Sequence, residues 1–192
     1  MNKIVFLLLV LFFSAFAQQI SVLTDARDGK KYKTVEIDSQ MWMAENLNYH
    51  ASGSKCYDNK PDNCAKYGRL YNWQTANTAC PNGWHLPSRA EWEALTMEVG
   101  GGKTEGLKLK AKSGWKSNGN GTDDFGFSAL PGGLGLSDGY FRNVGGSGYW
   151  WSSSSEDNSN SAYYRYIYYY DENAYWISSS KACLFSVRCV QD

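Results

Sequence analysis

The sequence predicts a mixed α+β domain, with strands near both ends of the chain, helices in its first half and an irregular middle. Three observations predict this class. Residues 32–37 alternate in polarity as a half-buried strand does, and Ser88 with Glu91 has the spacing of a helix capping box. Aromatic residues make up 16% of the chain and glycine is abundant, which is typical of short strands joined by tight turns.

Residues 1–17 predict a signal peptide. Lys3 supplies a positive start, and residues 4–13 are apolar but too short to span a bilayer. Ala15 and Ala17 form an A-x-A cleavage site, so we expect a mature chain that begins at Gln18. This predicts export to a periplasm, a cell surface or the medium, with no membrane span in the mature chain. An uncleaved anchor is the alternative.

Residues 18–192 are expected to form one domain, because this length can bury a single core and the chain shows neither repeats nor a linker. Basic and acidic residues number 19 each. A nucleic-acid-binding domain needs a strongly basic face, so this balance argues against a nucleic-acid partner.

The first half of the mature chain predicts a hairpin and three helices. Strands are expected at 32–37 and 41–44, with a turn between them. Apolar residues at helical spacing predict a helix over 69–79, which Pro81 ends. The capping box opens a second helix at Ser88, and three glycines at 100–102 end it. A short third helix is expected at 105–112.

The second half predicts loops and short strands. Residues 117–124 form a polar loop and 125–133 an apolar segment ending in a turn. Strands are expected at 140–141, 149–151, 162–170, 175–177 and 185–190.

Five cysteines in an exported chain favour disulfides over metal binding. Cys56 and Cys64 flank a short polar turn, which suits a local bridge. Cys80 and Cys189 could join the central element to the last strand. Cys183 is then left as a free thiol or as a competitor of Cys189, and the sequence alone leaves that pairing open.

Several ordered motifs resemble those of the Fibrobacter succinogenes major paralogous domain family. They occupy residues 28–35, 42–49, 67–71, 80–92, 126–133, 149–153 and 185–190. This family looks related to the C-type-lectin-like fold, in the branch that includes formylglycine-generating enzymes. The resemblance implies two main helices packed on a small twisted antiparallel sheet, a long irregular insertion and a Cys80–Cys189 bridge. It implies no biochemical role.

The polar loop raises the question of calcium. Asn118, Asn120, Asp123 and Asp124 offer oxygen ligands, but no bidentate Glu follows at the spacing of an EF-hand loop. A turn held by side-chain hydrogen bonds is favoured over a structural Ca²⁺. We expect no metal site and no other cofactor.

Catalytic patterns are weak. His85 lies between Trp84 and Leu86, which favours a structural role, and the chain has no nucleophile-elbow motif. We therefore expect a protein that is not an enzyme, and an unrecognised enzyme is the third interpretation.

Residues 149–180 are rich in Tyr, Trp and Ser, a combination typical of adaptable recognition surfaces. A period of two along 162–170 places Tyr163, Arg165, Ile167 and Tyr169 inward. The opposite face then carries the candidate binding residues, which are Tyr164, Tyr166, Tyr168 and Tyr170, with Tyr175 on the next strand. The alternative is that these aromatic residues only pack the core, as we expect at least in part for Trp150, Trp151 and Trp176.

These observations lead to one expectation and one alternative. We expect a secreted, non-enzymatic binding module that recognises a glycan or a cell-surface protein through its Tyr/Trp/Ser-rich face. The alternative is a structural or interaction domain of the cell envelope that has no small ligand.

Overall fold

The computed structural model describes residues 20–157 and 159–192. The predicted signal peptide, residues 1–17, and the predicted first mature residue, Gln18, lie outside the described residues. Within them, no helix is long and apolar enough to cross a bilayer.

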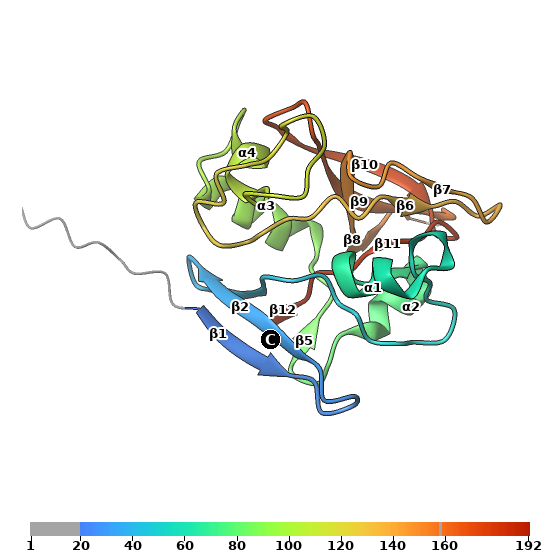
Figure 1. Ribbon diagram of the computed structural model, residues 1–192. Helices are drawn as coiled ribbons and strands as arrows, with labels where there is room; N and C mark the ends of the chain where they lie inside the picture. The colour runs from blue at the N-terminus through green and yellow to red at the C-terminus, as the bar shows by residue number, and fades with distance from the viewer. Residues whose placement is uncertain (1–19, 158) are drawn as a thin grey trace, which may run out of the picture.

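The fold is mixed α+β with more sheet than helix, as predicted (Figure 1). The first sheet has the strand order β1 (Ile20–Thr24), β2 (Lys31–Ile37), β3 (Gln40–Met43), β12 (Val190–Gln191) and β5 (Trp84–His85). The second has the order β10 (Ala174–Ser180), β9 (Ser161–Tyr168), β8 (Ser147–Ser155), β11 (Phe185–Ser186) and β4 (Leu70–Tyr71). A separate hairpin pairs β6 (Leu134–Gly135) with β7 (Phe141–Arg142).

The helices are α1 (Pro61–Tyr67), α2 (Trp73–Ala79), α3 (Arg89–Glu98) and α4 (Glu105–Leu109), preceded by a 3₁₀ turn, η1 (Tyr57–Asn59). The capping box at α3 is confirmed: the Ser88 side chain accepts from the Glu91 backbone, and Glu91 accepts from the Ser88 backbone. The predicted helix over 69–79 begins only at Trp73, because Leu70 and Tyr71 pair with β11. Helix α1 was missed, although Pro61 at its first position favours a helix start.

The strand predicted over 185–190 is in fact two strands in two different sheets. Ser186 pairs with Trp150 in the second sheet, whereas Val190 pairs with Trp42 in the first. Between them the chain passes from one sheet to the other: the carbonyl of Val187 accepts from Leu47, and the carbonyl of Cys189 already accepts from Met43 of β3. The structure therefore has two five-stranded sheets and a parallel β8–β11 pair, instead of the single antiparallel sheet that the resemblance implied. Figure 1 shows the C-terminus lying beside the first sheet.

Arg188 lies at this crossing and is fully buried. Its guanidinium donates to the side-chain oxygen of Asn46 at 3.1 and 3.2 Å, to the carbonyl of Met43 at 3.1 Å and to the carbonyl of Phe127. In the part of the chain that the structure describes, no carboxylate lies within ion-pair distance of it. Burial lowers the pKa of Arg188 to about 9, so the group keeps its charge at neutral pH. Neutral oxygens from three chain segments thus hold one buried cation.

Asn46 connects the Arg188 crossing to the second sheet. Its side-chain oxygen also accepts from the indole nitrogen of Trp150 at 2.8 Å, and its amide donates to the carbonyl of Tyr67 at 2.8 Å. Both Asn46 and Trp150 are buried. Asn46 therefore links β8, α1 and the Arg188 crossing.

The irregular segment between α4 and β6 is held by polar contacts. The ammonium of buried Lys110 donates to the carbonyl of Asp171 at 2.9 Å. Asn120 accepts from the backbone of Trp115, and the carboxylate of Asp123 accepts from both the backbone and the hydroxyl of Ser128. The polar loop at 117–124 thus contains a turn held by side-chain hydrogen bonds, the arrangement that the sequence favoured. Within residues 20–157 and 159–192, no group of three or more His, Cys, Asp or Glu residues has the arrangement of a metal site.

Two disulfides are present, Cys56–Cys64 and Cys80–Cys189, and both predicted pairings are confirmed. Cys183 is a buried free thiol. The second bridge joins the end of α2 to the crossing next to Arg188, over a sequence separation of 109. On the loop-entropy estimate, closing a loop of this length stabilises the fold by about 5 kcal/mol.

His85 joins the C-terminus to the start of α3. Its Nδ1 lies 2.6 Å from a carboxylate oxygen of Asp192, and its Nε2 lies 2.7 Å from a carboxylate oxygen of Glu91. Burial alone would lower the pKa of His85, but the two carboxylates outweigh it and the pKa rises above its usual 6.5. Both ring nitrogens thus contact carboxylates, and the imidazole bridges Asp192 and Glu91.

The raised pKa predicts how stability depends on pH. Protonated His85 stabilises the folded state fully below the unfolded pKa of 6.5, and this contribution is lost as pH rises through the folded pKa. The His85 side chain is 41% exposed, so solvent screening limits the effect to less than about 1 kcal/mol. Urea unfolding at pH 6.0 and pH 8.5 should show the wild type losing this amount and His85→Gln losing none of it. Equal pH slopes for the two proteins would contradict the role of the ion pairs.

Candidate functional site

The predicted candidate residues come together on one face of the β9–β10 hairpin. Side chains of β9 alternate, with Arg165 and Ile167 buried on one side and Tyr164, Tyr166 and Tyr168 on the other. Tyr175 of β10 lies directly opposite Tyr166 and so joins the same face. We call this set the tyrosine face; it consists of Tyr164, Tyr166, Tyr168, Tyr170 and Tyr175.

The rings of the tyrosine face lie against one another. Ring centroids are 5.1 Å apart for Tyr166 and Tyr175, with planes inclined by 21°, and 5.1 Å apart for Tyr168 and Tyr170, with planes inclined by 11°. Tyr164 and Tyr166 are in contact at 5.8 Å. The rings of the tyrosine face therefore form one contiguous aromatic surface.

The row is less exposed than its predicted outward position implied. Tyr170 is 68% exposed, but Tyr164, Tyr166 and Tyr168 are half-buried. The reason is that buried aromatic side chains of β8 and β11 share this face. Phe185 packs against Tyr164 at 4.6 Å, and Tyr149 stacks on Tyr166 at 6.1 Å. Tyr164 therefore also belongs to the packing beneath the face.

The hydroxyl groups of Tyr164, Tyr166 and Tyr168 remain protonated over the physiological range. Burial is the main cause that raises the pKa values of Tyr164, Tyr166 and Tyr168 above their usual value. Within the described residues, the hydroxyls of Tyr164 and Tyr166 make no hydrogen bond in the structure. Each can therefore both donate to and accept from a ligand.

Sequence reasoning missed the polar residues at the end of the face. The Tyr175 hydroxyl donates to the Asp171 carboxylate at 2.5 Å and accepts from the Asn173 amide at 3.1 Å. On β8, the Tyr149 hydroxyl accepts from the Asn143 amide at 2.8 Å. The signal was the Asp171–Asn173 turn between the two strands, which places polar side chains next to the last tyrosines. These contacts fix the orientation of two rings.

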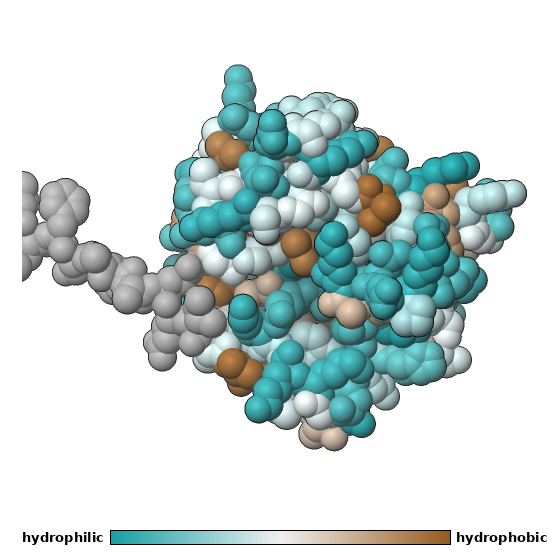
Figure 2. All heavy atoms as spheres, in the orientation of Figure 1, coloured by the Kyte–Doolittle hydropathy of each residue, from teal (hydrophilic) through white to brown (hydrophobic). Residues whose placement is uncertain are grey.

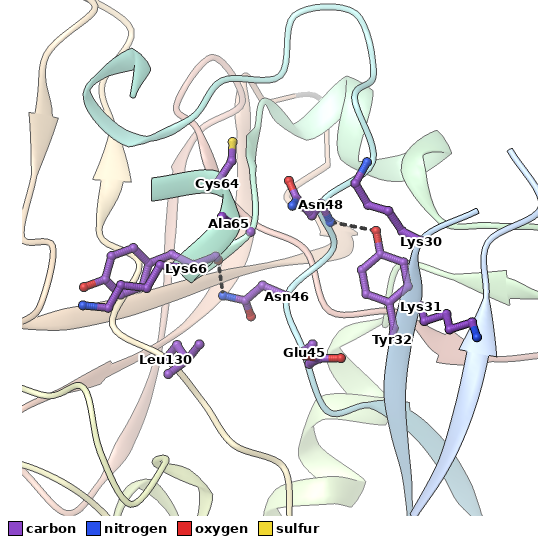
Figure 3. Close-up of a pocket in the computed structure, with 12 residues that line it drawn as sticks. Lys30, Lys31, Tyr32, Glu45, Asn46, Asn48, Cys64, Ala65, Lys66 and Leu130 are labelled. Carbon is purple, nitrogen blue, oxygen red and sulfur yellow. Dashed lines mark hydrogen bonds between the residues drawn. The ribbon is translucent and has the colours of Figure 1, made fainter. Parts of the chain in front are cut away.

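Another candidate site is a hollow of about 220 Å³ between β2, α1 and the segment 45–48 (Figure 3). Its polar groups already bind one another: the Asn46 amide donates to the Tyr67 carbonyl, the Asn48 backbone donates to the Tyr32 hydroxyl at 3.1 Å, and Glu45 accepts from the Lys33 backbone. The side chains that line it therefore connect β2 to α1. This favours a structural role for the hollow.

The view in Figure 2 shows a mainly hydrophilic surface on which hydrophobic residues stand in small separate patches. Patches of this kind are ordinary for a folded protein surface. This side of the molecule therefore offers no broad apolar docking surface that competes with the tyrosine face as a candidate site.

Comparison with known proteins places the chain in a family. No curated protein and no solved structure matches it. The model of the Fibrobacter succinogenes major domain matches residues 35–191, which include every strand of the second sheet and all four α-helices. The chain belongs to the Fibrobacter succinogenes major domain family.

Proposed function

We propose that the mature chain, residues 18–192, is a secreted, non-enzymatic binding module of C-type-lectin-like fold. Its tyrosine face recognises a glycan or a cell-surface protein. Export agrees with the apolar N-terminal segment in the sequence and with the two disulfides, which persist in oxidising compartments.

One observation carries the proposal: five tyrosines form a contiguous face whose rings hold one another in place. Stacked rings lose little freedom when a ligand binds, so the entropy cost of binding is small. Tyrosine supplies area together with a hydroxyl that donates and accepts, which suits the hydroxyl groups of a glycan or the polar groups of a protein surface.

The partial burial of the face favours the alternative, a structural or interaction domain of the cell envelope. Tyr164 contacts Phe185 at 4.6 Å and Trp151 at 6.2 Å, so its ring packs the second sheet whether or not a ligand binds. Ligand recognition and a purely structural role differ in whether they need the hydroxyl groups of the tyrosine face. Only ligand recognition requires them.

Removing hydroxyls while keeping rings separates the two functions. In the variant Tyr164→Phe/Tyr166→Phe/Tyr168→Phe the ring packing remains, so we expect the thermal midpoint to stay within about 2 °C of the wild type. Binding to the ligands found on a glycan array, or to a surface protein captured by pull-down, should weaken at least about tenfold, since several hydrogen bonds of about 0.5–1.5 kcal/mol each are lost.

The matched control is Tyr163→Phe, which removes a hydroxyl from the side of β9 that carries Arg165. It should bind as the wild type does. Equal binding by the triple variant and the wild type would contradict recognition through the tyrosine face. A protein that binds neither glycans nor a surface partner would favour the structural alternative.

Export predicts a defined N-terminus. Intact-mass analysis of protein recovered from the medium or the periplasm should give a chain that begins at Gln18, because the A-x-A site ends at Ala17. Ala17→Arg should block cleavage and leave a heavier, membrane-associated product. A recovered wild-type chain that still begins at Met1 would contradict the predicted signal peptide.

A further inference from the structure

The other side of the β9–β10 hairpin borders a pocket that the tyrosine face does not use. The pocket has a volume of about 750 Å³ and is lined by α3, the glycines at 100–102, the first residue of α4, and β9 and β10. This volume lies within the range of small-molecule sites. Met97 lines it and is 78% exposed, so the pocket opens to solvent.

A buried ion pair stands in the wall of this pocket. Arg165 is 4% exposed and Glu105 is 5% exposed. Their closest approach, Arg165 Nη2 to Glu105 Oε1, is 3.7 Å, which is too long for a hydrogen bond. The same Nη2 donates instead to the Thr96 hydroxyl at 2.7 Å. A donor and an acceptor therefore lie side by side without satisfying each other.

Two polar atoms of the pocket residues have no partner within the described part of the chain: Glu105 Oε2 and the indole nitrogen of Trp176. A buried polar atom without a hydrogen bond destabilises the folded protein, and a charged group without one does so more strongly. A ligand that donates to Glu105 would offset this cost. Because Glu105 Oε2 is buried, the pocket wall must shift slightly before a ligand hydroxyl can reach it. The three glycines at 100–102 line the same pocket and carry no side chains that would resist such a shift.

The charges of the pocket select the class of ligand. Burial lowers the pKa of Arg165 to about 10, so it remains a cation at neutral pH. A cationic ligand would meet this guanidinium, and an anionic ligand would meet the carboxylates of Glu93 and Glu105. A neutral ligand with adjacent hydroxyl groups meets neither repulsion, because each hydroxyl can donate to the carboxylate and accept from the guanidinium. Met97, Ala174 and Trp176 offer apolar surface for its carbon skeleton.

We propose that this pocket binds a neutral sugar residue, with Glu105 accepting from and Arg165 donating to neighbouring hydroxyls beside the Trp176 indole. The choice of a sugar as the ligand rests on the proposed glycan-binding function. Its site is separate, since Arg165 and Trp176 pair across the hairpin on the side opposite the tyrosines.

Saturation-transfer NMR with single sugars tests the pocket. We expect binding of at least one of glucose, galactose and mannose, with weaker binding of glucosamine, a cation, and glucuronate, an anion. Glu105→Gln keeps the shape of the side chain but removes its charge, and should weaken binding at least about tenfold, the usual loss for a hydrogen bond to a charged group. Glu98→Gln, an exposed carboxamide substitution on the same helix as Met97, should bind as the wild type does.

Trp176→Phe is the second variant, because Glu105→Gln leaves Arg165 without its counter-charge and can lower stability. It removes only the unpartnered N–H and part of the ring, and it should also weaken binding. The pocket is ruled out if no neutral sugar binds, if the charged sugars bind better, or if both variants bind as tightly as the wild type.

The phenylalanine variant of the tyrosine face should leave monosaccharide binding unchanged. Array and pull-down binding that is unchanged in the phenylalanine variant, together with intact monosaccharide binding, would contradict the tyrosine face and still support the pocket.

Discussion

The structure depends on the burial of one cation, Arg188, where the chain passes from the second sheet to the first. A buried charge is costly unless polar groups surround it. Here the groups are neutral: the Asn46 amide oxygen and the carbonyls of Met43 and Phe127, which come from the end of β3, the segment after it and the irregular insertion. Each segment alone would leave the guanidinium short of acceptors. Only the assembled fold supplies all of them, so Arg188 favours one arrangement of the two sheets.

This arrangement gives the β9–β10 hairpin two different faces. Strand β8, fixed by the Trp150–Asn46 bond, pairs with β9 along most of its length. One side of the hairpin then packs tyrosines over Phe185, and the other side turns Arg165 toward α3 and α4. Lys110 is a further buried cation, and it ties the start of the insertion to the end of β9 through backbone carbonyls. The two proposed binding sites are therefore the two sides of one well-anchored hairpin.

Local signals in the sequence predicted local features. The capping box set the start of α3, the period of two separated Tyr164 from Arg165, and the compartment and family resemblance pointed to the two disulfides. Features that depend on distant contacts were not predictable. Nothing near residues 187–189 shows that their carbonyls bind Leu47 and Met43, and so the division of the last strand was missed. The half-burial of Tyr164 depends on Phe185, which is 21 positions away in the sequence. The predicted inward position of Arg165 is itself a signal, because a buried arginine requires polar partners, and these are Thr96 and Glu105.

A double-mutant cycle with Arg188→Met and Asn46→Leu tests the central role of the buried cation. By urea unfolding, each single variant should lose about 3–5 kcal/mol, because either buried carbonyls or a buried charge are left without partners. The double variant should be more stable than the sum of the single losses predicts, by more than about 1 kcal/mol, since the two groups share one network. Losses that add within about 0.5 kcal/mol, or an Arg188→Met variant as stable as the wild type, would contradict this account of the fold.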